Sequence, residues 1–349
     1  MAETTRTTSQ APERATTDAS AVLELLAGGY VAQVLHAVAA LHIADHLADE
    51  PRTAEDVADR AGSHTRATYR LMRAAASLGV LSYEGDGRFG LTGRGQLLRD
   101  GVAGSMRSYV LVQTGHAHWQ SWGLFPDAVR HGASQTTKAL GTDIFDYYGR
   151  AENAAEATLF SQGMGDLSAM VSQGTVAAVD TTGVDTAVDV GGADGHLVMA
   201  LMAADPNLSG QVVDLPHVVP DAVRKAEALG MTDRLVVTAG DFFTAVPPAD
   251  LYLLKTVLHD WNDDQCTTIL RNCRAGIRAG GRALIVETVI GELGKPDYAT
   301  LSDMLMLTMT HGMERDLHEF DALFAASGWR RTKTFPVGGG YHGIELVAA

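Results

Sequence analysis

The sequence is poor in cysteine and in basic residues, and both shortages limit what the protein can be. Only two of the 349 residues are cysteine, and Cys266 and Cys273 lie seven positions apart in what reads as one helix. This spacing suits two reduced thiols better than a disulfide framework, which favours a cytoplasmic protein. Lysine and arginine number 27 against 42 acidic residues, giving a net charge of −15. Such a charge repels polyphosphates, so nucleic acid is not expected as a partner.

Long apolar runs are also scarce. The N-terminus lacks the apolar segment of a signal peptide, and the most apolar stretch, residues 25–44, contains Gln33, His36 and His42. We therefore expect no association with a membrane. Residues 1–20 carry threonines and charges without an apolar period, which predicts a disordered tail.

The next part of the chain has helical periodicity and ends in a β-hairpin signal. Helices are expected at 25–44, 43–47, 53–61 and 65–78, and two β-like runs, 80–83 and 88–91, flank Gly85-Asp86-Gly87. This order is typical of a winged helix, which we assign to residues 21–100. A helical connector is expected over 101–180, with helices at 118–130 and 151–173.

Residues 181–349 alternate between strand and helix patterns. The expected strands cover 186–190, 211–214, 235–239, 251–256 and 282–287, with late strands at 331–335 and 342–347. This alternation predicts an α/β fold with a doubly wound, Rossmann-like sheet, which binds ligands beyond the carboxyl ends of its strands.

Glycines and acidic residues stand at these strand ends. The first strand runs into Asp189-Val190-Gly191-Gly192-Ala193-Asp194-Gly195, where glycine allows a ligand to approach the backbone. A dinucleotide motif starting at Gly191 would need glycine at Ala193 and His196, so that motif is excluded. An ordinary glycine turn is the alternative to a ligand-binding loop.

The next two strands end in carboxylates. Asp214, followed by Leu215, could accept hydrogen bonds from ribose hydroxyls, or it could cap a helix. Gly240-Asp241-Phe242 offers a carboxylate for an adenine amino group and an aromatic face for its ring. A plain Asx turn is the alternative there.

The fourth strand leads into Leu258-His259-Asp260-Trp261, and at this point the chain resembles a known family. The stretch is similar to the signature of S-adenosylmethionine-dependent small-molecule O-methyltransferases, which include plant caffeic-acid and flavonoid enzymes and bacterial enzymes that tailor aromatic polyketides. The resemblance runs from about residue 21 to the end. It implies a class I methyltransferase domain, an N-terminal winged-helix dimerisation domain, a homodimer and S-adenosylmethionine as cofactor.

The resemblance also implies roles for single residues. His259 is the expected general base, flanked by Glu287 and Glu314. An imidazole suits this task because a phenolate attacks a sulfonium methyl group far better than a phenol does. The expected cofactor-binding residues are Asp189, Gly191, Asp214, Leu215, Gly240, Asp241, Phe242 and Lys255. A solvated charge is the alternative for Lys255. The loop departs from the common family pattern at Ala193 and Asp194, and Asp194 is expected to face solvent.

For the substrate wall we predict Phe160 and Met164, which lie one helical turn apart, together with Asp260, Met304 and Met309. Methionine packs well on flat rings, although core packing explains the same run. No metal site is expected.

The sequence thus predicts methyl transfer to a hydroxyl, expected to be phenolic, of a small aromatic molecule in secondary metabolism such as antibiotic biosynthesis. One alternative is a relative that uses the cofactor for decarboxylation or hydroxylation. Another is a winged-helix DNA-binding regulator, because Arg66, Arg70 and Arg73 share a helix face. The overall acidity of the chain argues against the regulator.

Overall fold

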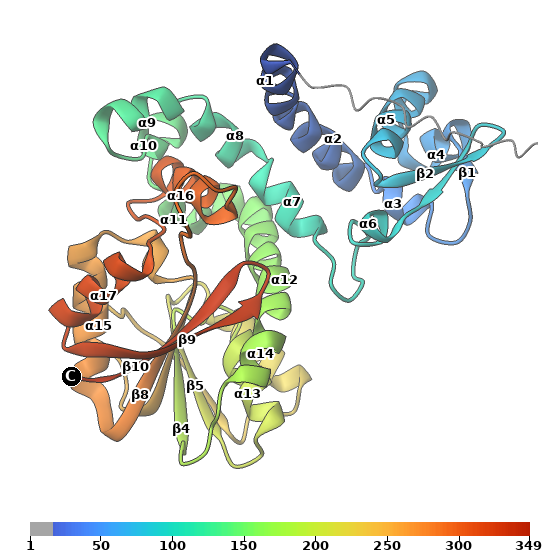
Figure 1. The fold of residues 1–349 in the computed structure, drawn as a ribbon. Helices are drawn as coiled ribbons and strands as arrows, with labels where there is room; N and C mark the ends of the chain where they lie inside the picture. Colours follow the sequence, from blue (N-terminus) through green and yellow to red (C-terminus); the bar gives the residue numbers. More distant parts are fainter. Residues whose placement is uncertain (1–16) are drawn as a thin grey trace, which may run out of the picture. The chain divides into compact units, whose positions relative to one another are not determined.

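A computed structural model describes residues 17–349 of the chain, which divides into two compact units, residues 1–95 and 96–349 (Figure 1). Most of the predicted tail lies outside the described residues. The helix α1 (Asp18–Leu26) nevertheless begins within it, because the Thr17 side chain caps the helix by accepting from the Ser20 N–H. The division after Gly95 lies close to the predicted boundary, and the predicted connector forms part of the second unit.

The first unit contains the expected helices and hairpin, with one correction. The single apolar helix predicted over 25–44 is wrong, since α1 ends at Leu26, Ala27 separates it from α2 (Gly28–Ala40), and a further helix, α3, begins at Ile43. The other elements are α3 (Ile43–His46), α4 (Ala54–Ala61), α5 (Thr65–Ser77), β2 (Leu81–Gly85) and β3 (Arg88–Leu91). A short strand that the sequence did not predict, β1 (Arg52–Thr53), pairs with β3, so the sheet order is β1-β3-β2.

The second unit begins with helices. These are α6 (Gly93–Gln96), which spans the division, α7 (Arg107–Gln113), α8 (His116–Trp122), α9 (Phe125–His131), α10 (Thr136–Leu140), α11 (Ile144–Gly149) and α12 (Ala154–Ala178), with the short η1 (Ala151–Asn153) before α12. The one helix predicted over 118–130 is wrong. It is split at Gly123, and Pro126 stands in the first turn of α9, where its missing N–H costs nothing.

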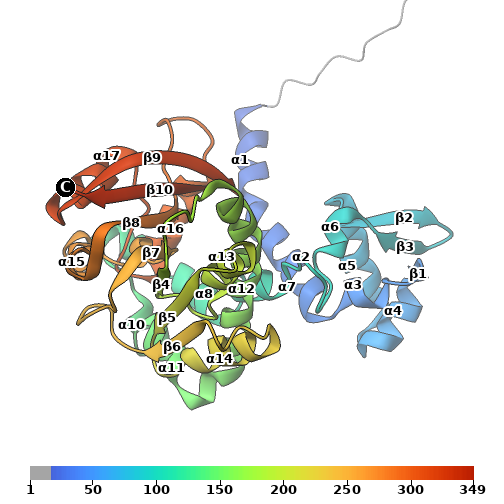
Figure 2. The ribbon, with the colours of Figure 1, turned by 90° about the horizontal axis from the view of Figure 1, so that it is seen from below.

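A seven-stranded sheet forms the rest of this unit, with the order β6-β5-β4-β7-β8-β10-β9. The strands are β4 (Thr186–Val190), β5 (Ser209–Asp214), β6 (Leu235–Ala239), β7 (Ala249–Lys255), β8 (Ile277–Thr288), β9 (Trp329–Gly338) and β10 (Tyr341–Ala348). The first five are parallel, and β10 runs antiparallel to both β8 and β9. Figure 2 shows β9 and β10 at one edge of the sheet. The predicted doubly wound fold is confirmed.

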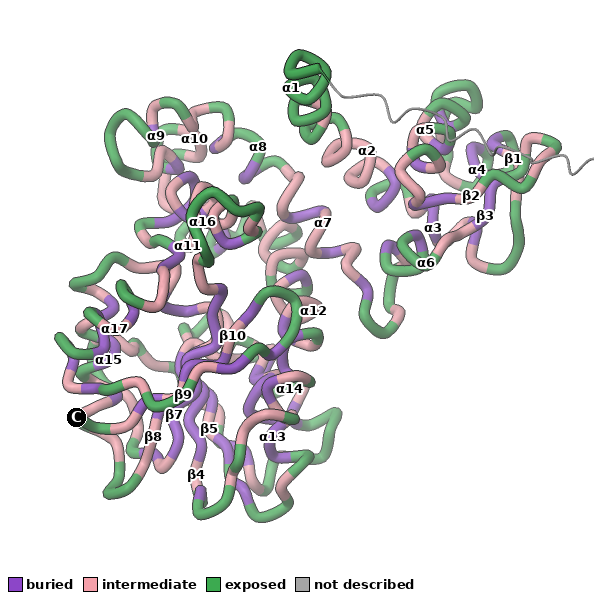
Figure 3. The backbone as a smooth tube through the Cα atoms, viewed as in Figure 1, coloured by how far each residue is buried: buried purple, intermediate pink, exposed green. Residues whose placement is uncertain are grey.

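Helices bury both faces of the sheet. One core includes side chains of α12 and α13 (His196–Ala204) and of α14 (Val219–Ala228). The other includes α15 (Asp263–Gly276) and α17 (Leu317–Ala326). The central strands β4 and β7 are accordingly buried along most of their length (Figure 3). Both predicted thiols, Cys266 and Cys273, are free and lie buried in α15.

This topology fixes where a ligand can bind. The chain reverses its strand order between β4 and β7, and doubly wound sheets bind ligands at such a point, beyond the carboxyl ends of the strands. The helices α11 and α16 (Tyr298–Met309) lie beyond that edge of the sheet (Figure 1). The residues predicted from strand ends therefore gather there.

Candidate active site

The loop between β4 and α13 forms an open backbone cradle. Gly191 has a φ of +67°, and a Cβ at this position would lie 3.0 Å from a methyl group of Val257. The Gly191 N–H donates to the Val213 carbonyl at 2.9 Å, which ties the loop to β5. A side chain at Gly191 would fill the space that a ligand needs, so the cradle fits a small molecule that approaches the backbone closely.

The two departures in this loop have distinct structural effects. Ala193 adopts a left-handed φ of +50°, which is strained for a residue with a Cβ, and its N–H donates to Asp214 Oδ2 at 2.8 Å. Asp194 does not simply face solvent as expected, since its side chain is only 25% exposed and lies 2.6 Å from Lys225 Nζ. The loop is thus held by Asp214 on one side and by Lys225 on the other.

Asp189 and Lys255 lie deeper than the loop. Asp189 is 2% exposed and accepts from the Val198 N–H of α13, and burial raises its pKa to about 7. Lys255 Nζ donates to the Thr256 hydroxyl, and burial lowers its pKa against the opposing effect of Asp189. The alternative of a fully solvated Lys255 is therefore wrong. Asp189 lies against the loop, where a Cβ at Gly192 would come within 2.7 Å of its carboxyl carbon.

The ends of β5 and β6 supply polar and aromatic groups. Asp214 Oδ1 accepts from the Leu215 N–H, and burial raises the Asp214 pKa. Asp241 forms the local turn that was the alternative to adenine binding, because it accepts from the Phe243 N–H and the Thr244 hydroxyl. Phe242 packs edge-on against Trp261, with ring centroids 6.0 Å apart. Gly240 fits beside Asp214, whose carbonyl accepts from its N–H.

His259 lies in a short turn after β7, η2 (Leu258–Asp260), and its imidazole faces both predicted glutamates. Nδ1 is 3.2 Å from Glu287 Oε2 and 3.3 Å from Glu314 Oε1. Neither oxygen is aligned for a hydrogen bond with Nδ1, so these contacts are ion pairs. Both acids meet the same ring nitrogen, which leaves Nε2 for a reacting molecule. The nearest carboxylate to Nε2 is that of Asp260, at 3.9 Å.

Backbone contacts hold the turn in place. Glu287 is fully buried, and its Oε1 accepts from the N–H groups of Val257 and Leu258 at 3.0 and 2.8 Å. Glu287 therefore positions both the turn and the imidazole that follows it. Thr256 has a φ of +54°, a strained conformation for a β-branched residue.

Two residues near Glu314 have functions that the sequence did not indicate. Arg315 is 1% exposed and donates to the carbonyls of Leu258 and Trp261. These hydrogen bonds hold the turn that carries His259. At Gly312 a Cβ would lie 2.0 Å from the His259 carbonyl, so glycine allows this loop to reach the base. Both residues lie in the stretch Gly312-Met313-Glu314-Arg315, and their closeness in sequence to the predicted Glu314 was the available signal.

Burial and the neighbouring charges have opposing effects on the pKa values of this cluster. Burial lowers the pKa of His259, but Glu287, Glu314 and Asp260 outweigh it and raise that pKa to about 10. Burial raises the pKa of Glu287 to about 7 and that of Asp260 to about 6, in each case against the attraction of His259. Burial also acts to raise the pKa of Glu314, but His259 with the Thr288 and Ser302 hydroxyls brings it below its ordinary value.

By proximity alone, His259, Glu287 and Glu314 could ligate a metal ion, because one donor atom of each lies within 4.8 Å of the others. However, both Glu314 oxygens accept side-chain hydroxyls, from Ser302 at 2.7 Å and Thr288 at 2.5 Å. Each of these hydrogen bonds occupies one lone pair of a Glu314 oxygen. The absence of a metal site stays a prediction.

The predicted substrate-wall residues fall into two groups. Phe160 stacks on Tyr148 at 4.6 Å, and Met309 is 3% exposed in the same helical cluster, which matches the core-packing alternative. Met164 and Met304 are half-buried on α12 and α16. Asp260 lies beside the base, with a side chain that is 22% exposed.

The comparisons with known proteins agree with this geometry. A family model described as an O-methyltransferase domain matches residues 122–330, and one described as an O-methyltransferase dimerisation domain matches residues 23–100. Phenazine O-methyltransferase PhzM of Lysobacter antibioticus is 34% identical over 93% of this chain and 95% of its own. Mitomycin biosynthesis 6-O-methyltransferase of Streptomyces lavendulae is 34% identical over 96% and 97%.

A solved structure shows the same similarity. Human N-acetylserotonin methyltransferase in complex with S-adenosylmethionine has a TM-score of 0.87 and 27% identity, covering 96% of this chain and 99% of that one. The sheet order, the His-Asp-Trp turn with its two glutamates, and both family matches point the same way. The chain therefore belongs to the O-methyltransferase family and is an S-adenosylmethionine-dependent enzyme.

Proposed function

We propose that His259 is the general base that removes a proton from a phenolic hydroxyl during methyl transfer. The observation that supports this role is the convergence of Glu287 and Glu314 on Nδ1. The negative charges of two acids beside Nδ1 favour a proton on that nitrogen, so Nε2 accepts the proton of the acceptor. The paired acids also stabilise the imidazolium that forms.

The cofactor is expected to occupy the cradle at the ends of β4, β5 and β6. S-adenosylmethionine, when bound, supplies an electrophilic methyl group on a sulfonium. The chain's own groups fit its parts, because Gly191 keeps the backbone accessible and Asp214 offers a buried carboxylate. Leu215, which is 39% exposed, and the Phe242 ring would contact the adenine. Asp189 ties the loop to α13 through the Val198 N–H, and Lys255 lies close to that carboxylate.

Asp214→Ala is expected to weaken S-adenosylmethionine binding by roughly tenfold or more, since a hydrogen bond to a charged acceptor contributes about 1.5 to 3 kcal/mol. The variant also loses the acceptor of the Ala193 N–H. Asp214→Asn keeps a carbonyl oxygen for that N–H and is the matched control for loop geometry, so it should bind more tightly than Asp214→Ala. Calorimetry that gives wild-type affinity for both variants would remove Asp214 from the cofactor site.

We further propose a small aromatic acceptor from secondary metabolism, such as antibiotic biosynthesis. Two of the relatives bear the names of a phenazine and of mitomycin biosynthesis. The partly buried Met164 and Met304 suit a flat ring. Incubation with labelled S-adenosylmethionine and a panel of phenols, hydroxyquinones and hydroxybenzoates tests this, with an O-methylated product expected. A decarboxylated or hydroxylated product would support the alternative use of the cofactor.

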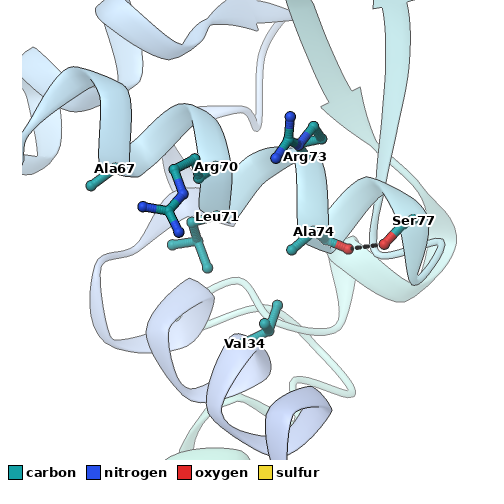
Figure 4. A pocket seen from close by; sticks show the side chains of 7 residues that line it. All are labelled: Val34, Ala67, Arg70, Leu71, Arg73, Ala74 and Ser77. Carbon is teal, nitrogen blue, oxygen red and sulfur yellow. Dashed lines mark hydrogen bonds between the residues drawn. The ribbon is translucent and has the colours of Figure 1, made fainter. Parts of the chain in front are cut away.

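The protein is proposed to be a cytoplasmic homodimer that pairs through its first unit. Helix α1 has no buried residue, and Leu25 on it is 81% exposed. Residues 18–40, with a mean hydropathy of 1.5, are long and apolar enough to cross a membrane, but interface helices share this composition. The same unit has a hollow between α2 and α5, where Val34 faces Leu71 and Ala74, and Arg70 and Arg73 also line it (Figure 4). The match to a dimerisation domain favours an interface.

Light scattering is expected to give twice the chain mass of 37.0 kDa at micromolar concentration. Leu25→Asp should shift the protein toward the monomer, because it places a charge in the apolar interface. Leu293→Asp is the matched control, since Leu293 is 84% exposed but lies in the second unit. A wild-type monomer, or a mass unaffected by Leu25→Asp, would contradict pairing through α1.

A further inference from the structure

Lys225, a residue outside the cofactor cradle, contacts the loop between β4 and α13 at two points. It lies on α14, and its Nζ is 2.6 Å from Asp194 Oδ2 and 2.7 Å from His196 Nδ1. Asp194 and His196 stand on either side of Gly195, the N-cap residue of α13. A single ammonium group therefore joins the end of the loop to the start of the next helix.

These contacts are partly buried. The side chains of Lys225 and Asp194 are 27% and 25% exposed, so water and salt screen their attraction less than that of a surface pair. The other carboxylate oxygen of Asp194 accepts from the His196 N–H at 3.1 Å. Helix α12 also comes close, because a Cβ at Gly165 would lie 3.4 Å from Asp194 Oδ2. Groups from α12, α13 and α14 therefore lie around this carboxylate.

The loop holds a strained residue next to Asp194. Ala193 has a φ of +50°, a left-handed conformation that glycine adopts freely and that the Cβ of alanine disfavours. Such a conformation persists only where the surrounding contacts impose it. Two contacts do so here, because the Ala193 N–H donates to Asp214 Oδ2 at 2.8 Å and Lys225 holds the next residue.

The acids around Asp194 make the positive charge of Lys225 important. Asp166 of α12 is one of them, and burial raises its pKa to about 6, with Asp100 and Asp194 adding to the rise. Asp194 also adds to the effect of burial that raises the pKa of Asp189. Lys225 offsets this repulsion. Without the lysine, the Asp194 carboxylate is expected to turn toward water and to release the loop.

The held segment belongs to the cradle proposed for the cofactor. Gly191, at its start, leaves space for a ligand, and Asp214 offers the carboxylate. A shift of Asp194 moves Ala193, and with it the hydrogen bond between Ala193 and Asp214. A loop that must be ordered when the ligand binds lowers the affinity, whereas a loop that is already held does not.

We propose that Lys225 is a positioning residue for the cofactor, and that its contacts with Asp194 and His196 hold the strained loop in the shape that binds S-adenosylmethionine and S-adenosylhomocysteine. This inference rests on the proposed cofactor cradle. It assigns a function in cofactor affinity to α14, which carries none of the residues expected to contact the cofactor.

The two ligands distinguish support of the loop from a direct effect of the lysine charge. S-adenosylmethionine carries a sulfonium charge, and S-adenosylhomocysteine lacks it. A direct charge effect of Lys225 changes the two affinities by different factors, because it repels only the sulfonium. Support of the loop changes both affinities by the same factor.

Lys225→Met keeps an unbranched side chain but removes the charge. Calorimetry is expected to give dissociation constants for S-adenosylmethionine and S-adenosylhomocysteine that both rise by about three- to tenfold. The kcat at saturating cofactor and the KM of an acceptor should stay at their wild-type values. Lys225→Arg, which keeps the charge, should restore part of the affinity.

Arg224→Met is the matched control. Arg224 precedes Lys225 on α14, is exposed, and pairs with Asp221 of the same helix. Its replacement removes a positive charge from the helix without touching the loop, so both dissociation constants should stay unchanged. A circular dichroism spectrum equal to that of the wild type shows that each variant is folded.

Two double variants test whether Lys225 acts through the loop. Lys225→Met should add little to Asp194→Asn, because each change removes the same ion pair. Its effect should also shrink in Ala193→Gly, where the loop is no longer strained. An unchanged affinity of Lys225→Met, different factors for the two ligands, additivity with Asp194→Asn, or an undiminished effect in Ala193→Gly overturns the proposal.

Asp214→Ala separates this proposal from that of the cradle itself. If Asp214→Ala weakens binding while Lys225→Met binds as the wild type does, the cradle stands and the role of Lys225 is refuted. If both variants bind as the wild type does, the cradle is refuted as well.

Discussion

His259→Ala is expected to lower turnover at neutral pH by about 10² to 10⁴-fold, or roughly 3 to 5 kcal/mol of barrier, while S-adenosylmethionine binding is retained. The variant removes the imidazole whose Nδ1 lies beside the two buried acids and whose Nε2 is proposed to accept the proton. The fold should survive, because Glu287 still accepts from two backbone N–H groups and Arg315 still braces the turn.

The loss should be partly reversible by pH. A phenol that ionises by itself needs no base, so the variant is expected to regain part of its activity in alkaline solution. His259→Asn gives the same test with a polar side chain, and His131→Ala, an exposed histidine at the end of α9, is the matched control. Near wild-type turnover of His259→Ala at neutral pH would leave positioning alone as the source of rate enhancement.

The parts of this site that follow from strand order could be predicted from the sequence. Asp214 and Gly191 end adjacent parallel strands, so their meeting follows from the alternation of strands and helices. The resemblance added Glu314, which no local pattern links to His259. Neither the strand order nor the resemblance showed that Glu287 and Glu314 meet the same nitrogen of His259. This meeting depends on how the loop after α16 packs against η2.

The other features that the sequence did not predict also depend on packing between distant segments or on breaks without a local signal. The break between α1 and α2 falls at Ala27, a residue that is a strong helix former and gives no local stop signal. The contact of Tyr109 with Tyr298 joins segments 189 residues apart, so periodicity within either segment carries no trace of it. Contacts of this kind are set by helix packing and become visible only in three dimensions.

The pH dependence of the wild-type enzyme should reflect the raised pKa of His259. Glu287 and Glu314 raise this pKa, against burial, to about 10, so the imidazole is mostly protonated at neutral pH. Only the unprotonated form accepts a proton. The kcat/KM for the acceptor is therefore expected to keep rising above pH 6.5, by up to about 100-fold between pH 7 and 9, where an unperturbed histidine would give a plateau.

The raised pKa also improves the match between base and acceptor. A phenol has an ordinary pKa near 10, so proton transfer to an unperturbed imidazole is uphill by about 3.5 pKa units, or roughly 5 kcal/mol. A histidine with a pKa of about 10 removes most of this cost. The enzyme thus holds less of its base in the reactive form at neutral pH, but that form is a stronger base.

Glu314→Gln tests this account of the charge. The substitution keeps hydrogen-bonding atoms for Ser302 and Thr288 but removes one negative charge beside Nδ1. The pKa of His259 should fall, so the rise in kcat/KM should move to lower pH and its plateau should be lower because the base is weaker. Glu152→Gln, at an exposed position, should leave the profile unchanged.

A comparison of two acceptors shows whether the histidine or the phenol is the group that titrates in the pH profile. With two acceptors of different phenol pKa, an inflection that belongs to His259 stays at the same pH, while one that belongs to the acceptor moves with it. If the wild-type profile is flat above pH 6.5, or if Glu314→Gln leaves the inflection in place, the acids do not set the basicity of His259. They would then act only by fixing the orientation of the ring, a role that His259→Ala and Glu314→Gln would reveal as a loss of rate that does not vary with pH.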